Sequence, residues 1–123
     1  MSQLPVAIVE DDAAIRRAYA DLLSAYDCDT VLFDSAEAFL EYAAASDVDC
    51  LLLDQRLPGM GGLELQLALR KMRPEIKIVF ITSQDDEATK TKAMQNGALR
   101  FLSKAGDVDE IIRTVLQLTH RPI

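Results

Sequence analysis

Short apolar runs alternate with longer amphipathic segments along the whole chain. A run of aliphatic residues bounded by polar or turn residues is typical of a buried strand. Most of the segments between the runs place apolar residues at i, i+3, i+4, i+7 and i+8, which is the spacing of a helix with one buried face. The predicted strands are Val6–Val9, Thr30–Phe33, Cys50–Leu53, Ile78–Ile81 and Leu99–Leu102.

The helical segments follow each strand and differ in how apolar their inner faces are. The expected inward residues are Ile15, Ala18, Tyr19, Leu22 and Leu23, then Ala36, Phe39, Leu40, Ala43 and Ala44, then Leu65, Ala68, Leu69 and Met72, and finally Val108, Ile111, Ile112, Val115 and Leu116. Asp34 or Ser35 is expected to cap the second helix. A fourth helix is expected over Asp85–Asn96, with Gly97 at its C-cap. Its apolar face is poor, and a helix that buries little is weakly anchored.

Repeated strand–helix units predict an α/β fold with a parallel sheet covered by helices on both faces. Right-handed crossovers allow few strand orders, and the doubly wound, flavodoxin-like order 2-1-3-4-5 is the expected one. We expect residues 1–119 to form one domain. Residues 120–123 leave the periodic pattern and are expected to be a tail or the start of a linker.

Composition limits the function classes that this segment can serve. Its 123 residues suit one domain, and a net charge of -7 argues against a surface that binds nucleic acid, so any DNA would be held by a separate domain. No apolar run approaches the roughly 20 residues of a membrane span, and the N-terminus lacks the pattern of a signal peptide. We therefore expect a cytoplasmic protein, with Cys28 and Cys50 as reduced packing residues.

Charged and polar side chains follow the predicted strands. They are Glu10, Asp11 and Asp12 after the first strand, Asp54 after the third, Thr82 after the fourth and Lys104 after the fifth. The carboxyl ends of parallel strands line one edge, where the predicted order places Asp54 centrally. Neighbouring carboxylates repel one another, and Mg²⁺ removes that cost. Beside Mg²⁺, an ionised Asp54 can attack a phosphorus centre while Lys104 and Thr82 stabilise the phosphoryl oxygens.

At these positions the chain resembles the receiver domain of bacterial two-component response regulators. The matching motifs are Ile8-Val9-Glu10-Asp11-Asp12, Leu52-Leu53-Asp54, Leu57-Pro58-Gly59-Met60-x-Gly62, Ile81-Thr82-Ser83, Gly97-Ala98 and Lys104. The resemblance implies a phosphoacceptor module, not an enzyme, that takes a phosphoryl group onto Asp54 from a sensor histidine kinase or a phosphotransfer protein. It implies Mg²⁺ binding by Asp11, Asp54 and the Arg56 carbonyl, with Glu10 acting through water. Thr82 and Phe101 resemble the family's switch pair.

The stretch from Phe33 to Leu40 further resembles FixJ/NarL-type regulators, whose output domains are helix-turn-helix DNA binders. This resemblance implies a role in transcription regulation. The expected output surface is the face formed by the fourth helix, the fifth strand and the last helix. A homodimer through the same face is expected on phosphorylation.

The sequence departs from the family pattern at three places. Ala105 follows Lys104 where the family nearly always has Pro after a cis bond, so we expect either a trans bond with a shifted loop or a strained cis bond. Gly61 stands where Asp or Ser is usual, which weakens the cap of the third helix. Arg56 and Gln84 occupy positions that tune dephosphorylation in such regulators, so the phosphoryl lifetime is specific to this chain.

Other readings of these residues stay open. One alternative is a pseudo-receiver that signals by binding alone. A flavodoxin-like cofactor binder or a small phosphohydrolase would share the topology, but the chain has no Gly-rich phosphate loop and no second carboxylate two residues after Asp54. Asp12 reads more simply as a helix N-cap. The alternative for Thr82 is a turn cap, and the alternative for Phe101 is a plain core position. Lys90, Lys92 and Arg100 form either a solvated face or a partner surface, and His120 has no assigned role.

Overall fold

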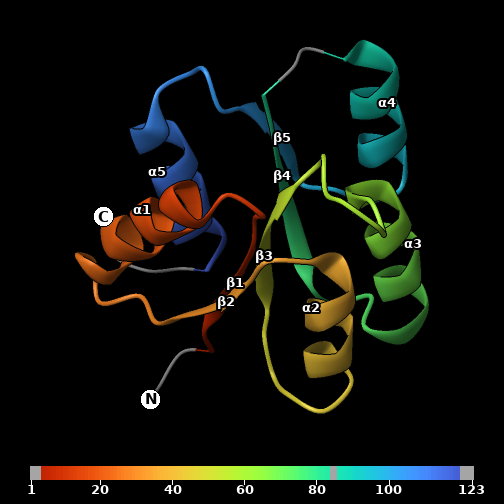
Figure 1. The fold of residues 1–123 in the computed structure, drawn as a ribbon, viewed down its shortest axis with the longest axis horizontal. Coiled ribbons are helices and arrows are strands. Elements are labelled where there is room, and N and C mark those ends of the chain that lie inside the picture. Colours follow the sequence, from red (N-terminus) through yellow and green to blue (C-terminus); the bar gives the residue numbers. More distant parts are fainter. Residues whose placement is uncertain (1–3, 84–85, 120–123) are drawn as a thin grey trace.

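The computed structural model describes residues 4–83 and 86–119, in which strands and helices alternate as the pattern predicts (Figure 1). The strands are β1 (Val6–Val9), β2 (Thr30–Phe33), β3 (Cys50–Asp54), β4 (Lys77–Thr82) and β5 (Arg100–Ser103). The helices are α1 (Ala13–Ser24), α2 (Ala36–Ala43), α3 (Gly62–Met72), α4 (Glu87–Gln95) and α5 (Val108–Leu118). The strand boundaries differ from the predicted ones by at most one residue. Helix α4 ends one residue before the predicted Asn96, and its predicted start, Asp85, lies outside the described residues.

The five strands form one parallel sheet in the order β2-β1-β3-β4-β5, which confirms the predicted flavodoxin-like fold. Helices α1 and α5 cover one face of the sheet, and α2, α3 and α4 cover the other (Figure 1). Residues of the central strands alternate between the two faces: Val6 and Ile8 pack toward α1 and α5, whereas Ala7 and Val9 pack toward α2 and α3. Both faces of the central strands are therefore buried.

Most of the predicted inner residues of the helices are buried, but the edges of the buried stripes differ from the prediction. Ala18 is exposed and Ala20 is buried in its place, while Met72 and Val108 are 39% and 40% exposed at the ends of their helices. Periodicity locates the centre of an apolar stripe better than its flanks, because the flanks depend on which neighbours the helix meets. Cys28 and Cys50 are buried on the α1–α5 face, as expected for packing residues.

Side chains cap several of the helices. The Asp12 carboxylate accepts hydrogen bonds from the amides of Ala14 and Ile15, which confirms Asp12 as the N-cap of α1. Ser35, one of the two predicted candidates, caps α2 by accepting from the Ala38 amide. Gly61 offers α3 no side-chain cap, but the Glu64 carboxylate accepts from the Gly61 amide at 3.3 Å.

Helix α4 buries little apolar surface and also receives two hydrogen bonds from α3. It begins at Glu87, after the N-cap Asp86, and Ala93 is its only buried residue. The Gln66 side chain, fully buried on α3, donates to the Ala93 carbonyl at 2.8 Å. One turn further along α3, the Arg70 guanidinium donates to the Asn96 carbonyl at 2.6 Å. The expected weak apolar anchoring of α4 is therefore observed, and two hydrogen bonds from α3 supplement it.

Across residues 4–83 and 86–119, every helix is too short or too polar to cross a membrane.

We predict that Gly62→Ala lowers the free energy of unfolding by about 1–3 kcal/mol, because overpacking forces neighbouring atoms apart. A Cβ at position 62 would lie 3.0 Å from both the Asp54 carbonyl oxygen and a ring carbon of Phe80. Gly61→Ala is the matched control, since a Cβ there would meet its nearest heavy atom, on Glu64, at 3.8 Å. Urea denaturation measures both variants, and equal stabilities would contradict the prediction.

Candidate functional site

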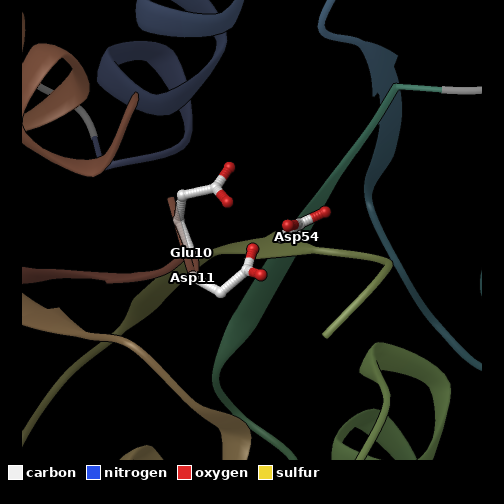
Figure 2. A group of neighbouring side chains, drawn as sticks. All are labelled: Glu10, Asp11 and Asp54. Atoms are coloured by element: carbon white, nitrogen blue, oxygen red, sulfur yellow. The ribbon is translucent and has the colours of Figure 1, made fainter. Parts of the chain in front are cut away.

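Three carboxylates come together at the carboxyl edge of the sheet. Glu10 and Asp11 directly follow β1, and Asp54 is the last residue of β3. Because β1 and β3 are neighbours with Val9 opposite Leu53, their ends are level. Oxygen atoms of Glu10, Asp11 and Asp54 lie within 4.8 Å of one another (Figure 2). Glu10 and Asp54 are buried, whereas Asp11 is exposed at the opening of the cluster.

Lys104, from the turn after β5, reaches into this cluster and contacts two of its acids. Its ammonium nitrogen lies 2.6 Å from Glu10 Oε1 and 3.3 Å from Asp54 Oδ2. The Lys104 amide donates to the Thr82 carbonyl at 2.7 Å, which ties the turn to the end of β4. The peptide bond between Lys104 and Ala105 is trans. With alanine at position 105, the lysine still reaches Asp54.

Burial and pairing act in opposite directions on these charges. Burial raises the pKa of the Glu10 carboxyl from 4.5 to about 7, although Lys104 and the Asp12 amide favour its ionised form. Burial also disfavours the charged form of Lys104, but its contacts with Glu10 and Asp54 outweigh this and raise the pKa of its ammonium above 10.5. Lys104 is therefore a cation at neutral pH, and burial makes the charge of Glu10 sensitive to pH near neutrality.

The loop after β3 is fastened at both ends by backbone contacts. The Gln55 amide donates to the Ile81 carbonyl at 2.9 Å, and the Gly62 amide donates to the Gln55 carbonyl at 3.2 Å. Between them the Arg56 amide donates to Asp54 Oδ1 at 3.2 Å. Arg56 thus lies beside the cluster through its main chain, and its predicted role as a carbonyl ligand stays a prediction.

Thr82 and Phe101, the predicted switch pair, lie on the neighbouring strands β4 and β5. Thr82 is buried at the end of β4, opposite Ser103. Phe101 is half-buried, and its ring stacks on that of Phe80 with centroids 5.7 Å apart. Their switching role stays a prediction. Gln84 and His120 lie outside the described residues.

Some contacts of the site were not foreseen from the sequence. The Arg16 guanidinium, on α1, donates to the Glu10 carbonyl at 2.7 Å. Lys104, predicted to stabilise phosphoryl oxygens at Asp54, lies closer to Glu10 than to Asp54. No local motif marks either contact, because each depends on how far a long side chain reaches between separate elements.

The donor set suits a hard divalent cation. Glu10, Asp11 and Asp54 supply carboxylate oxygens, and the Lys104 ammonium lies within ion-pair distance of Glu10 and Asp54. Mg²⁺ commonly binds through one or two carboxylates while keeping several waters, and the exposed position of Asp11 leaves room for water. The residues present therefore fit a magnesium site.

Residues 6–116 match the family model described as the response regulator receiver domain. This chain belongs to the receiver-domain family. A receiver domain is a phosphoacceptor signalling module rather than a catalytic enzyme, and it works with a cognate histidine kinase. The acidic cluster of Glu10, Asp11 and Asp54 is typical of the magnesium site of a receiver domain.

Several curated relatives of the receiver domain are about twice its length. Nodulation protein W of Bradyrhizobium diazoefficiens is 37% identical over 116 residues, which cover 94% of this chain and 51% of that protein. The transcriptional regulatory protein FixJ of Azorhizobium caulinodans is 35% identical over 112 residues, covering 91% of this chain and 53% of the relative. The chain thus spans about half the length of the curated relatives it matches.

Solved structures agree with this assignment. The response regulator StyR superposes with a TM-score of 0.84 at 36% identity, over 97% of this chain and 62% of that one. A CheY-like receiver domain protein from Methanospirillum hungatei superposes with a TM-score of 0.90, over 97% of this chain and 95% of that one. Its identity is 22%, so this likeness supports the fold alone.

We predict that the receiver domain binds Mg²⁺ about tenfold more weakly at pH 6 than at pH 8. Groups that hold a metal have to be deprotonated, so protons and Mg²⁺ compete for the acidic cluster. The pKa of Glu10 is about 7, so this carboxyl is mostly protonated at pH 6 and mostly ionised at pH 8. Calorimetric Mg²⁺ titrations at the two pH values measure the effect. Glu10→Gln should remove most of the pH dependence, and equal affinities in the wild type at pH 6 and pH 8 would contradict the assignment.

Proposed function

We propose that Asp54 accepts a phosphoryl group from a phosphohistidine of a sensor histidine kinase, in a reaction that depends on Mg²⁺. The observation that carries this proposal is the position of the Asp54 carboxylate. It lies 3.3 Å from the Lys104 ammonium, and oxygens of Glu10 and Asp11 lie within 4.8 Å of it. A nucleophilic oxygen is thereby placed beside both a cation and the other candidate metal ligands.

In the proposed step an ionised Asp54 oxygen forms a bond to phosphorus as the phosphorus–nitrogen bond to the donor histidine breaks. The imidazole leaves with the bonding electron pair and takes up a proton. Bound Mg²⁺ supplies positive charge for the phosphoryl oxygens, with Asp11, Asp54, the Arg56 carbonyl and Glu10, through water, as its proposed holders. Lys104 supplies further positive charge, and the Thr82 hydroxyl donates a hydrogen bond to a phosphoryl oxygen.

The proposed output is a change of the surface formed by α4, β5 and α5. A phosphoryl group adds nearly two negative charges beside Thr82 and Lys104, which biases any element with two available arrangements. Thr82 turns toward the new group, and Phe101 moves inward. The shallow anchoring of α4, with Ala93 as its one buried residue, supports it as the element that shifts.

The wider setting of the receiver domain is also a proposal. We propose residues 1–119 as its extent, with 120–123 as a tail or linker start, since the family match ends at residue 116. The names and lengths of the relatives favour a separate DNA-binding output domain and a role in transcription regulation. We propose a cytoplasmic location, because kinases find ATP there. We propose a histidine kinase or a phosphotransfer protein as the phosphoryl donor. We further propose homodimerisation through the α4–β5–α5 surface.

The contact between Lys104 and Asp54 favours phosphoryl acceptance over a pseudo-receiver that only binds partners. A pseudo-receiver was considered because Ala105 replaces the usual proline. The lysine nevertheless lies within ion-pair distance of both Asp54 and Glu10. This position of the lysine supports its proposed role of stabilising a phosphoryl group on Asp54.

The first test of this proposal is intact-mass spectrometry after incubation with acetyl phosphate, with and without Mg²⁺. We expect one phosphoryl adduct in the wild type, dependent on Mg²⁺, and none in Asp54→Asn, which keeps the shape of the side chain but removes the nucleophilic oxygen. Stoichiometric labelling of Asp54→Asn at another residue would overturn the assignment. No adduct on a wild type that binds Mg²⁺ would favour the pseudo-receiver.

A second prediction separates phosphorylation of Asp54 from the conformational change that follows it. Thr82→Ala should still be phosphorylated, but its switching equilibrium should fall about tenfold or more, because a hydrogen bond to a charged group contributes about 1.5–3 kcal/mol. Amide chemical shifts of Arg100–Ser103, compared before and after phosphorylation, measure this equilibrium. Shift changes as large as in the wild type would show that the Thr82 hydroxyl does not couple the site to β5.

A further inference from the structure

A carboxylate on α2 holds the middle of the loop that follows β3. Glu37 Oε2 accepts a hydrogen bond from the Met60 amide at 3.1 Å, across 23 positions of sequence. The loop runs from Gln55 to Gly61 and contains Arg56, whose carbonyl is a proposed ligand of Mg²⁺. The contact therefore connects a helix outside the acidic cluster to the segment that completes it.

The turn in this loop is shaped to admit the carboxylate. Gly59 has a φ of +75°, a conformation that glycine adopts readily and other residues rarely do. A Cβ at position 59 would lie 2.6 Å from Glu37 Oε2, so the carboxylate occupies the space that a side chain there would need. Glycine at position 59 thus allows both the turn and the close approach of Glu37.

Apolar packing and the hydrogen bond to Glu37 constrain this loop in different ways. Its ends are fixed by backbone hydrogen bonds at Gln55 and Gly62, and Leu57 and Met60 pack against the α2–α3–α4 core. Apolar packing has no preferred direction, whereas a charge-assisted hydrogen bond to an amide sets the orientation of the peptide unit. The bond from Glu37 orients the loop four residues after Arg56.

We propose that Glu37 is a positioning residue for the magnesium site, which it serves by fixing the loop that presents the Arg56 carbonyl. This inference rests on the proposed function. Glu37 touches neither the acidic cluster nor Lys104 among the described contacts, so it acts through the loop. Groups that orient the holders of a metal commonly affect its affinity strongly, even when they do not bind it.

The chain offers a matched control for the loss of charge. Glu41 lies one turn after Glu37 on the same face of α2, and both line a shallow groove of about 570 Å³ beside Met72. Like Glu37 it is exposed. In the part of the chain that the structure describes, its carboxylate has no hydrogen bond to the loop after β3. Glu41→Ala therefore removes the same charge from the same helix and leaves the Met60 contact in place.

The test measures Mg²⁺ affinity by calorimetry and hydrogen exchange of the Met60 amide by NMR, with no phosphoryl donor present. Glu37→Ala should weaken Mg²⁺ binding roughly five- to tenfold, at the low end of the effect of groups that orient metal ligands, and should speed Met60 exchange. Glu37→Gln keeps an acceptor oxygen and should bind within about threefold of the wild type. Glu41→Ala should stay within about twofold, since exposed charges are screened by salt.

If the wild type is phosphorylated on Asp54 and Glu37→Ala binds Mg²⁺ as tightly as the wild type, the proposed role of Glu37 is wrong and the proposed function stands. Equal weakening by Glu41→Ala, or no recovery in Glu37→Gln, would also overturn the proposed role of Glu37, because the effect would then come from charge and not from the position of the loop. A wild type that binds no Mg²⁺ would overturn both this inference and the proposed function. A wild type that binds Mg²⁺ but is never phosphorylated, with Glu37→Ala weakened as expected, would overturn only the proposed function.

Discussion

Glu10 and Asp54 are acidic side chains buried at the carboxyl edge of the sheet, and their charges have to be balanced there. Removing two carboxylates from water is costly unless a cation pairs with them. Lys104 neutralises part of this negative charge through contacts with both acids, and a divalent cation beside Asp11 would neutralise the rest. The parallel sheet makes this balance possible, because it brings the ends of β1, β3 and β5 to a single edge.

This arrangement is consistent with a phosphorylation site. In the proposed function, Asp54 is the nucleophile, and the positive charges of Lys104 and a bound cation favour the oxygens of an incoming phosphoryl group. In the proposed function the response passes along β4 and β5 to α4. Thr82 ends β4, and the Phe101 ring stacks on Phe80 within the same pair of strands. The hydrogen bonds to α4 from Gln66 and Arg70 are directional, and such contacts are more easily exchanged between two arrangements than a large apolar interface.

The fold and the acidic cluster were predictable from the sequence for the same reason. Strands buried on both faces appear as aliphatic runs, and the residues that follow each run lie at the carboxyl edge of a parallel sheet. Glu10, Asp11, Asp54 and Lys104 were found in this way, and the structure brings all four together. Long side chains that reach between separate elements were not predictable. Arg16 to the Glu10 carbonyl, Gln66 to Ala93 and Glu37 to Met60 are of this kind, because each depends on the packing of two elements.

The measurement that tests the central claim most directly is chemical mapping of the acyl phosphate. The protein is treated with acetyl phosphate and Mg²⁺, then reduced with borohydride, which converts an aspartyl phosphate to homoserine, and its peptides are sequenced by mass spectrometry. The account predicts homoserine at residue 54 alone, and none when Mg²⁺ is withheld. Homoserine at another aspartate, or at residue 54 to the same extent without Mg²⁺, would contradict the claim that Asp54 accepts the phosphoryl group at a magnesium site.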